Sequence, residues 1–162
     1  MLSKLDALGI RPEPGATATH AAVMSPEKVK VLLTEDPTLG TAAATDELIM
    51  RVPDPAEGAA WYAKWFGASL VTNGKDSIAK IPGMNMRFVA TSTPVTGTHG
   101  RALDHIGFDV HNLQELVMKM QAAGVTVNAP YKSMSFGFLT GIAFVTDPWG
   151  TYIELNEGYD GH

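Results

Sequence analysis

Two polar side chains interrupt apolar stretches of the sequence where they could support chemistry. His105 lies within Ala-Leu-Asp-His-Ile-Gly-Phe, and Glu154 lies within Tyr-Ile-Glu-Leu. Both stretches are typical of β-strands, and a carboxylate on a buried strand face is costly unless it is paired or bound to a metal. An imidazole and a carboxylate are both ligands that a divalent metal accepts. A histidine that is only hydrogen-bonded within the core is the alternative interpretation.

The elements that must position these residues follow one plan twice. The first copy is expected to be strand, helix and three strands, over residues 47–52, 54–67, 68–72, 77–81 and 85–90. The second copy is expected over residues 105–110, 112–124, 125–127, 141–145 and 151–156. We therefore predict an α+β fold of paired βαβββ modules that form a cupped mixed sheet, with modules at residues 46–91 and 104–158.

The first 36 residues are similar to the second half of a module. Residues 2–10 align with 117–125, and residues 22–35 align with 144–157. This extra N-terminal half-module (residues 1–36) would contain a helix and two strands, and residues 37–45 would be a linker. An incomplete sheet leaves an open edge, so we expect a second subunit of a homodimer to cover it, or a longer natural chain. Chance similarity is the alternative.

Charge and composition exclude several classes of function. The net charge of −5 comes without basic runs, which argues against nucleic-acid binding. The chain has no cysteine, so disulfides, thiolate nucleophiles and Cys-ligated metals are excluded. No stretch is apolar enough over sufficient length for a membrane span or a signal peptide. We therefore expect a cytoplasmic protein that does not contact membranes; the absence of cysteine is also compatible with export.

The sequence resembles the vicinal oxygen chelate superfamily, which includes glyoxalases, bleomycin resistance proteins and extradiol dioxygenases. Two segments carry the resemblance: Leu-Asp-His-Ile-Gly-Phe-Asp-Val at 103–110 and Thr-Asp-Pro-Trp-Gly-Thr-Tyr-Ile-Glu-Leu at 146–155. The resemblance covers 46–157 and implies a cup formed by two modules, with a divalent metal held by the first and last strands of each. Carried over by position, His105 and Glu154 fall on metal-ligand positions of the family.

The first module departs from the family pattern at both equivalent positions. Glu47 stands where the family usually has histidine. When the two modules are aligned, Arg87 stands at the position equivalent to Glu154. One hypothesis is a triad of Glu47, His105 and Glu154 with open positions for substrate oxygens. In the alternative, Glu47 and Arg87 form an internal ion pair, the metal is lost or weak, and the cup only binds a ligand. A register shift of two residues would place Asn85 at the position of Arg87.

The resemblance implies a metal-dependent enzyme that acts on a small oxygenated substrate as a glyoxalase- or dioxygenase-like lyase, isomerase or oxygenase. It does not distinguish Fe, Mn, Ni, Zn or Co as the divalent metal ion. Glu154 would be the catalytic carboxylate, and the predicted substrate contacts are Arg87, Tyr131 and Tyr152. The apolar, glycine-containing segment 133–141 would be a mobile lid or a packed loop, and His99 a solvated loop residue. The alternative function is a non-catalytic, resistance-type protein that binds a small molecule without metal.

Overall fold

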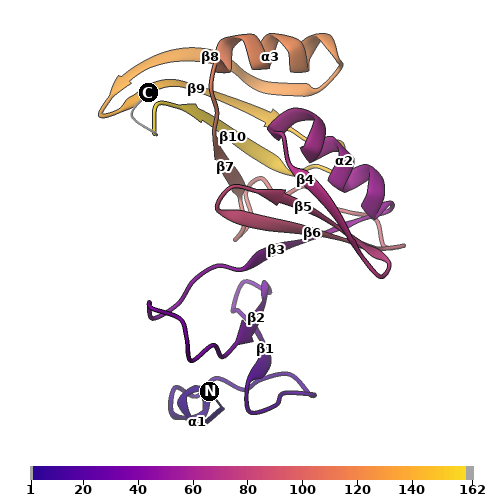
Figure 1. The fold of residues 1–162 in the computed structure, drawn as a ribbon, viewed down its shortest axis with the longest axis vertical. Coiled ribbons are helices and arrows are strands. Elements are labelled where there is room, and N and C mark those ends of the chain that lie inside the picture. Colours follow the sequence, from indigo (N-terminus) through magenta and orange to yellow (C-terminus); the bar gives the residue numbers. More distant parts are fainter. Residues whose placement is uncertain (1, 160–162) are drawn as a thin grey trace. The chain divides into compact units, whose positions relative to one another are not determined.

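The computed structural model describes residues 2–159 of the chain. It divides into two compact units, Met1–Ala44 and Thr45–His162. Figure 1 shows the elements of each unit in sequence colours, and the larger unit contains both candidate ligand residues, His105 and Glu154. Within the described part of the chain, no helix combines the length and the apolar character needed to cross a membrane.

The first module of the larger unit is a four-stranded mixed sheet with one helix. Its elements are β3 (Glu47–Val52), α2 (Pro55–Phe66), β4 (Ser69–Asn73), β5 (Asp76–Ile81) and β6 (Met84–Ala90). The strand order is β3-β6-β5-β4. The outer pair β3–β6 is parallel, and the two other pairs are antiparallel. The chain therefore runs strand, helix and three strands, as predicted.

The second module repeats this topology. Its elements are β7 (His105–Asp109), α3 (Leu113–Ala122), β8 (Thr126–Phe136), β9 (Leu139–Thr146) and β10 (Tyr152–Glu157). The strand order is β7-β10-β9-β8, with β7 and β10 parallel and the other pairs antiparallel. The predicted fold class, α+β with paired βαβββ modules, is confirmed.

Local sequence signals account for the bounds of α2. The Asp54 carboxylate accepts hydrogen bonds from the N–H groups of Ala56 and Glu57, at 2.8 and 3.2 Å. Such a side-chain cap satisfies N–H groups that the first helical turn leaves without an intrahelical acceptor. The helix ends at Gly67, whose φ of 66° lies in the left-handed region that glycine adopts without steric cost.

The start of α3 is capped by a residue from a distant strand. Asn112 precedes the helix with a φ of 53°, and its side chain makes no capping hydrogen bond. The Glu157 carboxylate, at the end of β10, accepts instead from the N–H of Leu113 at 3.2 Å. Glu115, in the first turn of the helix, pairs with Lys119 one turn later. A carboxylate 44 residues away in sequence thus fills the role expected of a neighbour.

The segment expected as a lid or loop is part of a long β-hairpin. β8 is eleven residues long and β9 is eight, whereas the sequence predicted only short strands at 125–127 and 141–145. Ser133 pairs with Gly141, and Phe136 pairs with Leu139. The pairing contains several register shifts, which are β-bulges or similar irregularities. Such interruptions weaken the alternating pattern by which a strand is predicted.

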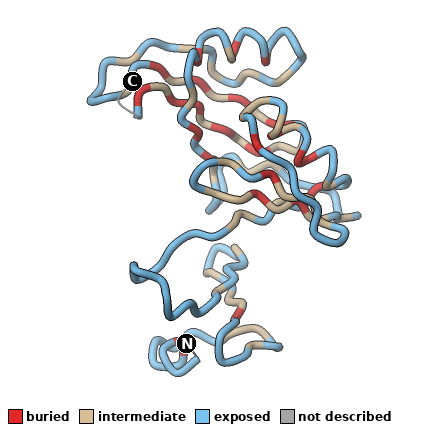
Figure 2. The backbone as a smooth tube through the Cα atoms, in the orientation of Figure 1, coloured by how far each residue is buried: buried red, intermediate tan, exposed pale blue. Residues whose placement is uncertain are grey.

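One hydrophobic core joins the two modules through α2. The Phe66 ring stacks on Phe108 of β7 with ring centroids 4.2 Å apart. The Tyr62 hydroxyl donates to the Asp147 carboxylate at 2.9 Å, and burial together with this carboxylate raises the pKa of Tyr62 well above its usual value. Figure 2 shows the buried positions along the strands and on the helix sides that face them. Helix α2 therefore packs against the buried side of the second sheet.

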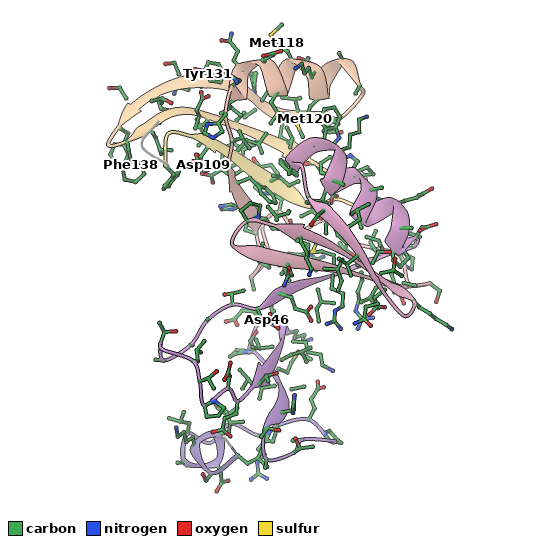
Figure 3. The ribbon with its side chains drawn as sticks, viewed as in Figure 1. Asp46, Asp109, Met118, Met120, Tyr131 and Phe138 are labelled. Atoms are coloured by element: carbon green, nitrogen blue, oxygen red, sulfur yellow. The ribbon has the colours of Figure 1, made fainter. Side chains whose placement is uncertain are left out.

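The helix α3 covers its own sheet through one face. Met120 is fully buried, whereas Met118, two residues earlier, is exposed. Figure 3 shows Met118 directed away from the sheet and Met120 toward it. Each sheet is therefore covered by helix on one side, and the opposite side carries the polar residues of interest.

The smaller unit contains α1 (Leu2–Ala7) and an antiparallel pair, β1 (His20–Met24) and β2 (Lys30–Thr34). In β1–β2, Val23 pairs with Val31, and in β9–β10, Val145 pairs with Ile153. These are the partners expected if residues 22–35 align with 144–157. The boundary of the unit at Ala44 falls within the predicted linker at 37–45.

Hydrogen bonds outside the strands follow the same alignment. The N–H of Ile10 donates to Leu5, as that of Val125 donates to Met120. In the turns before β2 and β10, the N–H of Ser25 donates to Val29 and the N–H of Asp147 to Thr151. The interpretation of residues 1–36 as a partial module stays a prediction, which this shared pattern supports; Met1 lies outside the described residues.

Candidate functional site

The strand pattern of the second module places His105 and Glu154 on the open side of the sheet. Ile106 and Phe108 of β7 are buried, so the alternating residues His105, Gly107 and Asp109 face the other way. In the parallel ladder, residue 105 is opposite 152 and residue 107 is opposite 154. The two candidate ligand residues are therefore neighbours on one face of adjacent strands.

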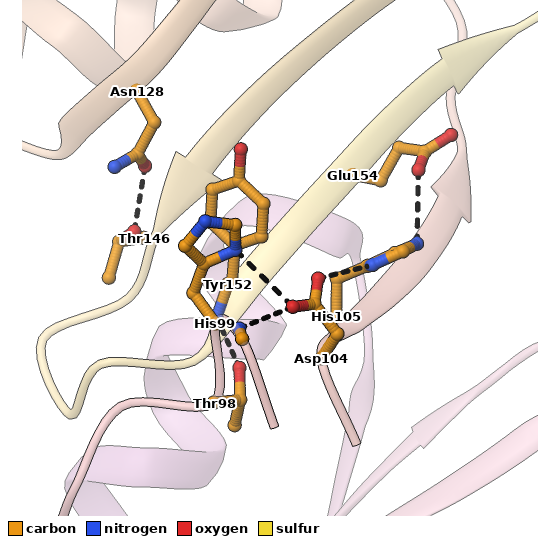
Figure 4. A network of polar contacts seen from close by, with 9 residues as sticks. Thr98, His99, Asp104, His105, Asn128, Thr146, Tyr152 and Glu154 are labelled. Atoms are coloured by element: carbon orange, nitrogen blue, oxygen red, sulfur yellow. Dashed lines mark hydrogen bonds and ion pairs between the residues drawn. The ribbon is translucent and has the colours of Figure 1, made fainter. Parts of the chain in front are cut away.

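The His105 imidazole lies between two carboxylates. Its Nε2 atom is 3.1 Å from Glu154 Oε2, and its Nδ1 atom is 2.8 Å from Asp104 Oδ1. The other oxygen of Glu154 accepts a hydrogen bond from the Asn156 amide at 3.0 Å. Figure 4 shows the contacts of His105 with Asp104 and Glu154, which lie on opposite sides of the ring. Since a carboxylate only accepts hydrogen bonds, a doubly protonated imidazole could donate to both.

Asp104 is an ionised acceptor in this group. The hydrogen bond from His105, and after it the bond from the Gly100 N–H, hold the pKa of Asp104 below its usual value. Its Oδ2 atom accepts from Gly100 and lies 3.4 Å from His99 Nδ1. Asp104 was not a predicted site residue, because it precedes β7 and the alternation of strand faces says nothing about its direction.

Tyr152 and its neighbours form an aromatic wall beside the His105–Glu154 pair. The Tyr152 ring stacks on Phe144 of β9, with centroids 5.1 Å apart, and lies 4.3 Å from the His99 ring. His99 is solvated in the segment between the modules, as the sequence suggested, with its side chain 71% exposed, and one side of its ring also contacts Tyr152. No local pattern in the sequence could have found this contact, since His99 belongs to the segment between the modules.

Glu47 and Arg87 form an ion pair at the equivalent place in the first module. Arg87 Nε is 3.0 Å from one Glu47 oxygen and Arg87 Nη2 is 2.8 Å from the other, so the contact is bidentate. Arg87 also lies 3.9 Å from Asp76. In the parallel β3–β6 ladder Glu47 is opposite Asn85, as His105 is opposite Tyr152. Arg87, rather than Asn85, is therefore equivalent to Glu154.

The metal site implied by the family resemblance can be tested against these donors. His105 and Glu154 have suitable atoms directed at each other. Glu47 has both oxygens bound to Arg87, and the guanidinium at the fourth position cannot bind a cation. Among the described residues, no three His, Cys, Asp or Glu side chains come together as a metal-binding group. Two of the four positions therefore suit a metal ion, and the set as a whole does not fit one.

The predicted substrate-binding residues lie in three different environments. Tyr152 is on the open face beside His105. Arg87 is on the open face of the first sheet, bound to Glu47. Tyr131 of β8 packs with the hydrophobic core and lies against Gly141 of β9. A Cβ added to Gly141 would lie 2.7 Å from the Tyr131 ring. The structure thus brings Tyr152, but not Tyr131, to the His105–Glu154 pair.

The comparison with protein families gives one match. The Glyoxalase/Bleomycin resistance protein/Dioxygenase superfamily matches residues 44–155. No curated protein matches the chain.

Solved structures with this fold are numerous. A genomically encoded fosfomycin resistance protein, FosX, from Listeria monocytogenes is 18% identical, with a TM-score of 0.60 over 73% of this chain and 95% of that one. TioX from Micromonospora sp. ML1 is 19% identical, with a TM-score of 0.55 over 72% and 99%. The oxidase ChaP-H2 is 18% identical, with a TM-score of 0.55 over 72% and 94%. With the two βαβββ modules and the family match over both of them, the chain belongs to the Glyoxalase/Bleomycin resistance protein/Dioxygenase superfamily.

Proposed function

We propose that this protein binds a small oxygenated molecule on the open face of its second module and moves a proton to or from it with His105 and Glu154. The observation that carries the proposal is the 3.1 Å contact between His105 Nε2 and Glu154 Oε2 on a sheet face without a helix. The His105 side chain is 42% exposed and that of Glu154 is 22% exposed. A ligand can therefore reach both groups.

The chemistry of this pair is general acid–base catalysis. One group would take a proton from a carbon or oxygen atom of the substrate, and the bonding electrons would stay on the substrate as an oxyanion. The other group would donate a hydrogen bond to that oxyanion, and the proton would return to a second atom of the substrate in an isomerisation. Tyr152 and Phe144 offer aromatic surface for the apolar part of such a ligand.

A metal-dependent enzyme of glyoxalase or dioxygenase type is the second candidate. The specific observation in its favour is that Asp104 contacts one nitrogen of His105 while Glu154 faces the other, an arrangement found around metal-binding histidines. The Glu47–Arg87 ion pair weighs against it, because it removes the third carboxylate. We therefore rank the metal-dependent enzyme second.

A second copy of the chain is part of the proposal. Within one chain, α2 joins the modules through the buried side of the second sheet, where Phe66 meets Phe108. The His105–Glu154 pair and the Glu47–Arg87 pair lie on open sheet faces, and their polar contacts stay within their own modules. A homodimer could bring the first module of one copy over the second module of the other. Arg87 would then approach an anionic substrate at His105.

The test combines metal analysis with binding of catechol, a small molecule with two neighbouring oxygens. Elemental analysis of the purified chain and of His105→Ala and Glu154→Ala decides between the two candidates. The first candidate predicts a metal-free protein whose amide NMR signals in β7 and β10 shift when catechol is added. It also predicts that both variants lose this response. Stoichiometric metal that disappears in both variants would support the second candidate instead. Absence of any response to catechol at millimolar concentration would count against a site for such ligands.

A further inference from the structure

We infer that Asp104 is a positioning residue that holds a proton on Nδ1 of His105, so that Nε2 is the nitrogen that exchanges protons with Glu154 and substrate. Asp104 Oδ1 is 2.8 Å from Nδ1, which is hydrogen-bond distance. The other oxygen of Asp104 accepts from the Gly100 N–H, and an aspartate carboxylate at neutral pH can only accept hydrogen bonds. Nδ1 must therefore be the donor. The inference rests on the proposed function only for the role of Nε2.

The second oxygen of Asp104 is anchored to the segment between the modules. Asp104 Oδ2 accepts from the Gly100 N–H and lies 3.4 Å from His99 Nδ1. A carboxylate that is held at both oxygens cannot rotate freely about its terminal bond. Asp104 therefore presents Oδ1 to His105 from a fixed direction, and an orientation imposed on the ring in this way also directs Nε2 at Glu154.

The anchoring segment is itself bound to the start of β10. Thr98 accepts from the Tyr152 N–H at 2.9 Å, and its own N–H donates to Gly150 at 3.0 Å. Gly97 and Gly150 pass so closely that a Cβ added to Gly150 would lie 2.8 Å from Gly97 Cα. The segment is thus fixed to the strand that carries Glu154. Asp104 and Glu154, which face opposite nitrogens of one ring, are held by a common framework.

The first module provides a natural comparison. Asp46 precedes Glu47 at the start of β3, as Asp104 precedes His105 at the start of β7. The Glu47 side chain is bound by Arg87 rather than by Asp46. An aspartate at this position is therefore not enough to orient the next side chain; the orientation in the second module depends on the hydrogen bond to an imidazole. Asp46→Asn is consequently a control that changes the same charge at the equivalent place.

The experiment reads the tautomer of neutral His105 from long-range 1H–15N NMR spectra, with the signal assigned by its loss in His105→Gln. In the unmodified chain we expect the proton on Nδ1. The same tautomer is expected in Asp104→Glu, provided that the longer carboxylate side chain contacts the ring. In Asp104→Asn and Asp104→Ala the proton should move to Nε2, whereas Asp46→Asn should leave the spectrum unchanged. An Nε2 proton in the unmodified chain overturns the inference even if every variant fails to fold. So does an unchanged tautomer in folded Asp104→Asn.

Binding then separates this inference from the proposed function. Loss of the hydrogen-bond partner that orients a metal-binding histidine typically costs about 10- to 100-fold in affinity or activity. By analogy, we expect a weakening in this range for catechol in Asp104→Asn but not in Asp46→Asn. Equal binding by both variants would contradict the positioning role. If catechol does not bind the unmodified chain, the proposed ligand site fails while the tautomer measurement still decides the role of Asp104.

Discussion

Arg87 of β6 and Glu154 of β10 occupy equivalent positions in the two modules. Arg87 is opposite Ile49 in the β3–β6 ladder, and Glu154 is opposite Gly107 in the β7–β10 ladder. Each contacts the side chain that opens the first strand of its own module, Glu47 or His105. One backbone plan thus supports a guanidinium–carboxylate pair in one sheet and an imidazole–carboxylate pair in the other. The two modules therefore differ in the charge of the side chain at this position, which is positive in Arg87 and negative in Glu154.

Removal of Arg87 should destabilise the first module. Glu47, whose side chain is 18% exposed with Arg87 in place, loses two charge-assisted hydrogen bonds in Arg87→Ala. We expect a loss of about 1–3 kcal/mol in the free energy of unfolding, measured by urea denaturation. Arg51→Ala is the control, because Arg51 is an exposed arginine on β3 and removes the same charge. Equal losses in the two variants would show that the bidentate contact adds nothing.

Mixed dimers should recover binding that two variants lose separately. If the site joins His105 of one copy to Arg87 of another, neither His105→Ala nor Arg87→Ala binds catechol alone. Random pairing after co-expression makes about half of the dimers mixed, each with one intact site, so about a quarter of the sites should return. Isothermal titration calorimetry gives the stoichiometry. A mixture that binds no better than its parents would rule out a site shared in this way.

Stability should fall at alkaline pH because of Tyr62. Its pKa is raised in the folded protein, chiefly by burial and then by Asp147, above the ordinary value of 10.0. The folded state therefore keeps the phenolic proton longer than the unfolded state. The stabilisation is complete below pH 10 and declines as the pH rises toward the folded pKa. Between pH 8 and pH 11, the Tm of the unmodified chain should fall more steeply with pH than the Tm of Tyr62→Phe. Parallel curves of Tm against pH would contradict this.

Gly58 should resist a substitution that normally stabilises a helix. Replacement of an interior helical glycine by alanine usually gains up to about 1 kcal/mol. At Gly58, however, the new Cβ would lie 2.6 Å from the Phe88 ring, which is fully buried in β6. We expect Gly58→Ala to lose about 1–3 kcal/mol by chemical denaturation. The double variant with Phe88→Leu should recover part of the loss; a stabilised single variant would refute the close contact.

The larger unit should fold without the smaller one. Residues 45–162 contain both βαβββ modules and the shared core, and the division of the chain falls at Ala44. We expect a fragment of these residues to keep its cooperative thermal transition and the His105 signals of the whole chain. Removal of the N-terminal residues could still change the oligomeric state, which light scattering would report. A fragment without a cooperative transition would show that the larger unit depends on residues 1–44.

Much of the fold could be predicted from the sequence because its signals are local. Asp54 caps α2 and Gly67 ends it within a few residues of chain. The turn that begins at Asp147 closes on its own carboxylate, which accepts from the N–H groups of Trp149 and Thr151. Strand alternation likewise places alternate side chains on one face. Such features require no knowledge of distant residues.

Contacts between distant residues were decided only in the tertiary structure. The sequence left open whether Glu47 would face a metal or Arg87. The answer depends on the β3–β6 register and on the packing of two side chains that are 40 residues apart in the chain. The sequence did not reveal the use of Asp104, or the Glu157 carboxylate that replaces Asn112 at the start of α3. Each is a hydrogen bond whose partners meet only after strands have paired or a connecting segment has been fixed. Residue types therefore determined the available chemistry, and packing decided which groups meet.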